Sequence, residues 1–254
     1  MTHADPRWGA EDRDRKAANI VDCLELFVDR DLATMSCVDI GCGSGGISYH
    51  LAPHFASVCG VDPEPWQRWQ EFSTERPNLN FIHESIETLS IEDNSVDVVI
   101  CNQVYEHVRS PQVLIAQIYR ILKPGGICYF AGPNLLFPIE PHVFWPFVHW
   151  IPRRWALGLL RIFSPTKVEA LDAYSATYWT LKRWLGAFSV VDAVPTIIRR
   201  RARAENAHPV WRLFRAFPSS VLKLFAFLSP GFVFLLAKPE DNVEFAGEAG
   251  PTKH

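Results

Sequence analysis

Short hydrophobic runs alternate with amphipathic stretches along the first half of the chain. Apolar residues recur at helical spacing within residues 8–30, which predicts a helix there. Beyond it the pattern predicts, in order, strand 36–40, helix 45–52, strand 57–62, helix 65–73, strand 79–83, strand 96–101, helix 111–122 and strand 126–131. Such alternation is typical of an α/β fold with a doubly wound, mostly parallel sheet.

The pattern changes after Pro133. Residues 133–173 lack the alternation and are rich in proline and aromatic residues, as in the run FPIEPHVFWPFVHW from 137 to 150. Prolines interrupt a long helix, and the segment is too long for an ordinary connection. We therefore predict an aromatic-rich cap inserted over about residues 133–173.

The sheet is expected to resume after the cap. Helix 177–185 is followed by strands at 188–194 and 232–237, which brings the predicted sheet to seven strands. A second insertion, basic and then apolar, separates these two strands at about 199–228. A chain of 254 residues is long enough for one domain over residues 1–254 and short for two.

A glycine-rich segment, VDIGCGSGG at 38–46, follows the first predicted strand and opens a helix. Glycines let the backbone turn tightly and approach a ligand closely, and the free N–H groups of the helix point at whatever lies over the loop. Gly41, Gly43 and Gly46 also satisfy the dinucleotide pattern G-x-G-x-x-G, with Asp62 available for a ribose hydroxyl. The loop alone therefore predicts a nucleoside site and leaves two cofactor families open.

Asp39 extends the loop to D-x-G-x-G-x-G, which resembles the first motif of class I S-adenosylmethionine-dependent methyltransferases. Three further segments are similar to that family in the same order: VCGVDP at 58–63, DNSVDVVICN at 93–102 and ILKPGG at 121–126. The resemblance covers about residues 36–131. It implies a Rossmann-like methyltransferase sheet and S-adenosyl-L-methionine as the cofactor.

The resemblance also implies roles for individual residues. The loop glycines would pass under the methionine part of the cofactor, Asp62 would bind the ribose hydroxyls, and Asp39 would order the loop. Ser85 stands at the adenine edge where most members have Asp. The cofactor-binding residues expected in this way are Asp39, Gly41, Cys42, Gly43, Gly45, Asp62, Pro63, Ser85, Ile86 and Asn102.

The segment CNQVYEHV at 101–108 is similar to a stretch of the ubiquinone-biosynthesis O-methyltransferases. That subfamily usually shows E-x-x-E-H, proposed to bind a divalent cation, and here the first carboxylate is replaced by Gln103. Loss of an anionic ligand weakens a magnesium site, so we expect no metal. His107 is a candidate general base, because imidazole titrates near neutral pH, and the alternative is a histidine that caps or packs a helix start. Glu106 is a second candidate catalytic residue.

The acceptor is expected to bind under the cap, beside His142, Trp145 and His149. The alternative is that these aromatic residues only attach the cap to the sheet. The basic run Arg199–Arg203 beside apolar residues is compatible with an anionic lipid surface, a phosphate-bearing substrate or a solvated face.

Composition excludes several classes of function. A net charge of −3 gives no field that would attract nucleic acid, and the six cysteines contain no C-x-x-C pair. Residues 1–10 lack an apolar signal core, and Lys223 with Pro230-Gly231 divides the apolar stretch 219–237. We expect a cytoplasmic protein, with peripheral contact to the inner membrane face as an alternative location.

The sequence thus predicts a small-molecule methyltransferase that O-methylates a lipophilic or lipid-linked acceptor of the quinone-precursor, glycolipid or polyketide type. The rival hypothesis is a binding or scaffold protein that keeps a methyltransferase fold without the chemistry. The intact glycine loop and Asp62 argue against that rival. The oligomeric state cannot be predicted from these patterns.

Overall fold

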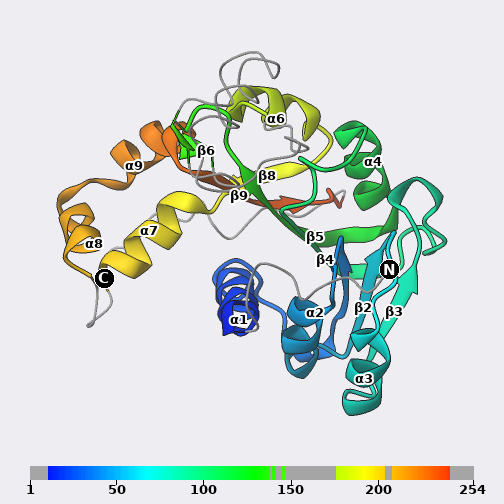
Figure 1. Ribbon diagram of the computed structural model, residues 1–254. Helices are drawn as coiled ribbons and strands as arrows, with labels where there is room; N and C mark the ends of the chain where they lie inside the picture. Colours follow the sequence, from blue (N-terminus) through cyan, green and yellow to red (C-terminus); the bar gives the residue numbers. More distant parts are fainter. Residues whose placement is uncertain (1–10, 138, 141–144, 147–175, 204–207, 241–254) are drawn as a thin grey trace.

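A seven-stranded sheet forms the centre of the protein (Figure 1), with strand order β3-β2-β1-β4-β5-β9-β8. The computed structural model describes residues 11–137, 139–140, 145–146, 176–203 and 208–240. The strands are β1 Ser36–Ile40, β2 Ser57–Asp62, β3 Leu79–His83, β4 Val96–Asn102, β5 Leu122–Pro133, β8 Ser189–Asp192 and β9 Gly231–Ala237. Strand β9 runs antiparallel to β5 and β8, and the other neighbouring pairs are parallel. The predicted doubly wound, mostly parallel sheet is confirmed.

Helices cover both faces of this sheet (Figure 1). They are α1 Glu11–Glu25, α2 Gly46–Leu51, α3 Arg68–Glu75, α4 Pro111–Ile121, α6 Tyr178–Trp184, α7 Val194–Arg203, α8 Pro209–Leu213 and α9 Ser219–Phe225. Short 3-10 helices are η1 Leu32–Thr34, η2 Ala52–His54, η3 Ile86–Thr88, η5 Phe214–Ala216 and η6 Ala226–Leu228. Helices α4 and α6 lie on one face, α1 to α3 on the other, and α7 to α9 extend from the edge near β8 and β9.

Strand β4 shows how the sequence builds two cores. Its side chains alternate between faces, so Val98 and Ile100 join the core beside α1 and α2. Val99 and Cys101 join the other core, beside α4 and α6. Because both faces are covered, the middle of the strand, Val98 to Cys101, is apolar on both sides, as expected for the centre of a parallel sheet.

The structure differs from the sequence prediction at several boundaries; α1, for example, ends at Glu25 rather than near residue 30. Strand β5 begins at Leu122, where a helix end was expected, because Leu122 adopts extended backbone angles and pairs with Val96. Helix α7 begins at Val194, directly after β8, and so starts before the second insertion predicted from residue 199.

Little of the predicted cap lies within the described residues. Two short strands, β6 Ile139–Glu140 and β7 Trp145–Pro146, pair with each other in antiparallel fashion. His142 and His149 fall outside the described residues, and Trp145 is described by its backbone alone. The predicted acceptor site under the cap therefore stays a prediction.

Candidate functional site

The loop after β1 turns through three glycines with positive φ: +69° at Gly41, +53° at Gly43 and +81° at Gly45. At Gly45 two features exclude a side chain: the positive φ, and the ring of Phe81, which lies 2.6 Å from the position that a Cβ would take. Gly43 has open space beside it within 4 Å. The loop thus presents bare backbone to a ligand at the carboxyl end of the sheet.

Asp62 lies at the end of β2, next to this loop. Its Oδ2 accepts a hydrogen bond of 2.8 Å from the backbone N–H of Gly43, and its Oδ1 accepts one of 3.0 Å from the N–H of Glu64. Because β1 and β2 are parallel neighbours, their carboxyl ends bring the carboxylate and the glycine loop together. Both oxygens keep a further lone pair with which to accept a hydroxyl.

Sequence reasoning missed an aromatic support for the loop. The indole N–H of Trp69 donates a 2.9 Å hydrogen bond to the carbonyl of Gly43, and the indole stacks on Phe81 with ring centroids 5.0 Å apart. Trp69 comes from α3 and Phe81 from β3, so two further elements support the loop. The available signal was a tryptophan on the buried face of a short amphipathic helix.

Asp39 is buried under the loop and accepts a 2.6 Å hydrogen bond from the hydroxyl of Ser48 in α2. Burial raises the pKa of this carboxyl to about 7, mainly because the charged form loses its hydration. The contact joins the end of β1 to the helix that follows the loop. It agrees with the loop-ordering role expected for Asp39.

Three further predicted cofactor residues, Pro63, Ser85 and Ile86, lie beyond the ends of β2 and β3. Asp62 pairs with His83 in the sheet, and the carbonyl of Pro63 lies 2.9 Å from the imidazole Nε2 of His83. Ser85 precedes η3, with its hydroxyl 3.3 Å from that of Thr88, and Ile86 is buried. These residues therefore follow the ends of β2 and β3, on the side of the sheet edge where Asp62 lies.

The predicted catalytic pair follows β4. The side chain of His107 is half-exposed and lines a large cavity that begins at the glycine loop. Glu106 is fully buried, and its Oε1 lies 4.0 Å from His107 Nε2. Tyr105 fixes this turn, because its hydroxyl donates to the carbonyl of Pro133 and accepts a 3.2 Å bond from the N–H of Ala176. The structure therefore separates the two residues: His107 can meet a ligand, and Glu106 can act only through a neighbour.

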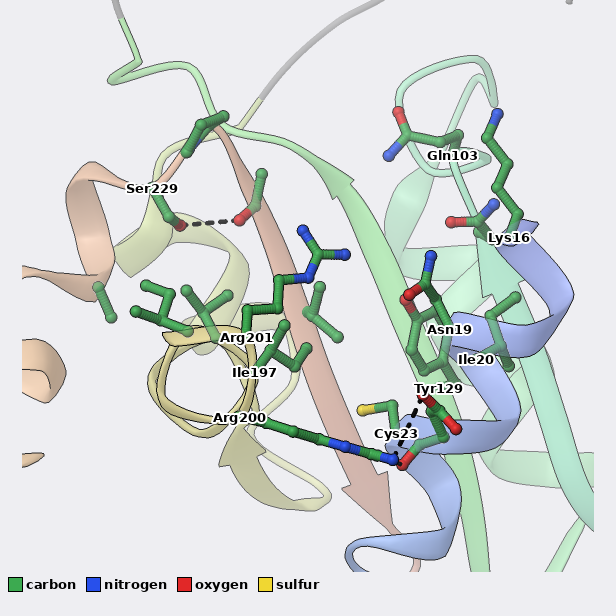
Figure 2. A pocket seen from close by; sticks show the side chains of 18 of the residues that line it. Lys16, Asn19, Ile20, Cys23, Gln103, Tyr129, Ile197, Arg200, Arg201 and Ser229 are labelled. Carbon is green, nitrogen blue, oxygen red and sulfur yellow. Dashed lines mark hydrogen bonds and ion pairs between the residues drawn. The ribbon is translucent and has the colours of Figure 1, made fainter. Parts of the chain in front are cut away.

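A continuous cavity of about 1500 Å³ starts at the loop, where Asp39, Gly41, Cys42, Gly43 and Asn102 line it, and passes His107. It then runs between α1 and the helices α7 to α9 (Figure 2). Within the described part of the chain, no three side chains of His, Cys, Asp or Glu are close enough to hold a metal ion.

Comparison with known proteins agrees with this geometry. Residues 38–130 match the family described as "Methyltransferase domain". Over these residues the resemblance to S-adenosylmethionine-dependent methyltransferases that the sequence predicts is confirmed, and the order of the sheet strands agrees with it.

Individual relatives refine the class. The ubiquinone biosynthesis O-methyltransferase of Coxiella burnetii (strain Dugway 5J108-111) is 33% identical over 103 residues, covering 39% of this chain and 44% of the relative. The protein of that name from Methylococcus capsulatus is 30% identical over 135 residues, 50% of this chain and 57% of the relative. The chain thus spans about half the length of the curated relatives it matches.

A solved structure extends the likeness over nearly the whole fold. The putative S-adenosylmethionine dependent methyltransferase from Listeria monocytogenes aligns with a TM-score of 0.55 at 19% identity, covering 89% of this chain and 99% of that one. At this identity the likeness shows the fold alone.

Proposed function

We propose that the protein transfers the methyl group of S-adenosylmethionine to an oxygen of a lipophilic small molecule and releases S-adenosylhomocysteine. The observation that carries the proposal is the single cavity that joins the glycine loop, His107 and a long apolar wall. A methyl donor and an acceptor must meet in line within one water-poor space, and this cavity offers both ends of such a space.

The loop end fits the cofactor. Asp62 is set to accept the ribose hydroxyls in charge-assisted hydrogen bonds, and Gly43 leaves room for a ligand against its backbone. Arg13 lies over the start of α2, with its Cγ 3.0 Å from the Cβ position of Gly46. Its Nε is buried without a hydrogen-bond partner among the described residues, which suits the carboxylate of the methionine moiety.

The chemistry needs little beyond positioning. When bound, the cofactor supplies a methyl group already activated by a sulfonium. The acceptor oxygen forms the new C–O bond as the C–S bond breaks, and its proton passes to the imidazole of His107. Glu106 is buried, with its Oε1 4.0 Å from His107 Nε2, and would act as a positioning residue that sets the orientation of the imidazole ring.

Titration calorimetry with S-adenosylhomocysteine and, separately, NADH tests the cofactor. We expect saturable binding of the first and none of the second at comparable concentrations. Tight NADH binding would instead support the dinucleotide reading of the G-x-G-x-x-G pattern. Binding without methyl transfer to any of a broad panel of phenols and hydroxylated lipids would support the scaffold hypothesis.

We also propose that α8 and α9 together contact the surface of an anionic bilayer. Leu213 and Leu224 are 69% and 66% exposed, and Phe225 is 53% exposed. Residues 208–237 contain Arg212, Arg215 and Lys223 but no Asp or Glu. Apolar side chains beside cations without anions are typical of interfacial segments. No helix in the described ranges is long and apolar enough to cross a membrane.

The protein should therefore sediment with vesicles that contain phosphatidylglycerol and be released as salt screens the cations. Changing Leu213 and Leu224 together to serine should weaken this binding by about tenfold or more, because two exposed apolar anchors are lost. Neither residue lines the cavity. Val113→Ser on α4, 37% exposed, is the matched control and should bind vesicles like the native protein. Retention of the native protein in the supernatant at low salt would refute the contact.

A further inference from the structure

The cavity has a second arm that the cofactor does not require. At about 1500 Å³ it exceeds the roughly 300–1000 Å³ typical of a pocket for one small molecule. The additional space lies between α1 and the helices α7 to α9, away from the glycine loop (Figure 2). A second molecule can therefore lie beside the cofactor within the same open cavity.

The wall of this arm is apolar on the side of the second insertion. It is formed by Ile197, Ile198, Trp211, Phe214, Phe217 and Leu222. Trp211 and Phe214 pack against each other with ring centroids 6.0 Å apart, as do Phe214 and Phe217 at 6.1 Å. Such a wall suits a hydrocarbon chain better than a sugar or a peptide backbone.

Arg201 is the exception in this wall. It extends from α7 into the space facing α1 (Figure 2), and its guanidinium lies 5.4 Å from the centroid of the Trp211 ring. The neighbouring Arg200 is engaged, since it donates a 3.0 Å bond to the carbonyl of Asp22 and lies 3.4 Å from the Asp22 carboxylate. Among the described residues no Asp or Glu forms an ion pair with Arg201. A guanidinium placed against an aromatic ring and an apolar wall favours a bidentate anion.

We propose that this arm is the acceptor site, and that it takes an amphiphile with one long apolar chain and a carboxylate or phosphate bound at Arg201. The inference rests on the proposed methyl transfer and gives it a substrate class. The chain lies along Trp211, Phe214 and Phe217, and the anion at Arg201 sets how far the acceptor reaches toward His107. The second insertion, rather than the cap alone, then selects the substrate.

Calorimetry on the protein saturated with S-adenosylhomocysteine tests the anion. Decyl phosphate below its micelle concentration should bind more tightly than decanol. Arg201→Gln should lower the affinity for decyl phosphate roughly ten- to a hundredfold, to near that of decanol, and leave decanol unchanged. Arg203→Gln, an exposed arginine on the same helix that does not line the cavity, should bind both ligands like the native protein.

Chain length tests the apolar wall. From butyl to decyl phosphate, affinity should rise by about fourfold per methylene group, the value expected for burial of each one. A flat series, or equal affinity for decanol and decyl phosphate, would overturn the proposal.

Two outcomes distinguish a failure of this acceptor-site proposal from a failure of the proposed methyl transfer on which it rests. Normal binding of S-adenosylhomocysteine with no binding of decyl phosphate would overturn the acceptor site and leave the cofactor site standing. Failure to bind S-adenosylhomocysteine would overturn the proposed function itself. The protein could instead bind decyl phosphate only when the phosphate is part of a vesicle, with Arg201→Gln and Arg203→Gln weakening that binding equally. This result would assign both arginines to a lipid surface and would also overturn the cavity site.

Discussion

Asp62→Ala should weaken binding of S-adenosylmethionine by roughly tenfold to several hundredfold, the scale of one or two hydrogen bonds to a charged group. The carboxylate lies at the end of β2 and is held against the glycine loop by the 2.8 Å bond from Gly43 N–H. The variant removes the acceptor for the ribose hydroxyls and that brace together. Titration calorimetry with the cofactor and with S-adenosylhomocysteine measures the loss.

Asp62→Asn distinguishes the two contributions. Its amide oxygen can still accept from Gly43, whereas the charge and the second acceptor oxygen are lost. An affinity for Asp62→Asn close to that of Asp62→Ala would assign the effect to the ribose contact, and a near-native affinity would assign it to the brace. Glu92→Gln, at an exposed carboxylate remote from the loop in the sequence, is the control. Unchanged affinity in both Asp62 variants would show that the carboxylate does not bind the cofactor.

The first half of the fold could be predicted because its signals are local. Strands β1 to β4 are short apolar runs between turns, and the order of loop, acidic strand end and later motifs fixes the sheet. The end of β1 and the end of β2 meet in any parallel sheet of this order, so Asp62 and the loop could be brought together from sequence alone. The organisation as one domain over residues 1–254 stays a prediction.

The second insertion could not be placed in the same way. Its contact with α1 joins Arg200 to Asp22, which are 178 residues apart, and no local pattern specifies such a pairing. Trp211, an apolar residue of this insertion, lines the cavity, whereas Leu213 and Leu224 are the more exposed apolar side chains. The sequence of an amphipathic segment shows that it has an apolar and a polar face. It does not show which neighbouring element covers each face.

Residues 106 and 107 show the same limit at a single turn. The sequence offered His107 as a candidate general base and Glu106 as a second catalytic candidate. In the fold Glu106 is fully buried, whereas the side chain of His107 is 48% exposed. Backbone direction at the end of β4 decides which of two neighbours faces the cavity, and that direction depends on Tyr105 being fixed by Pro133 and Ala176.

His107→Ala should lower the rate of methyl transfer by about a hundredfold or more and leave cofactor affinity near native. The imidazole lines the cavity beyond the glycine loop, where an acceptor hydroxyl must lose its proton. A base must be unprotonated to act, so the native rate should fall as the pH is lowered, and this acid limb should vanish in the variant. Single-turnover transfer of a labelled methyl group across pH measures both effects.

Glu106→Gln separates positioning from base catalysis. If Glu106 acts through His107, the variant should lose part of the rate and shift the acid limb of the pH profile, while the limb itself persists. Thermal melts of each variant serve as the control, because the buried site of Glu106 makes loss of folding a competing explanation. Activity that survives chelator treatment would agree with Gln103 replacing a metal-binding carboxylate of the related subfamily. A loss of stability in His107→Ala that matches its loss of rate would instead make this histidine a packing residue, and the base would have to be sought among the other polar groups that face the cavity.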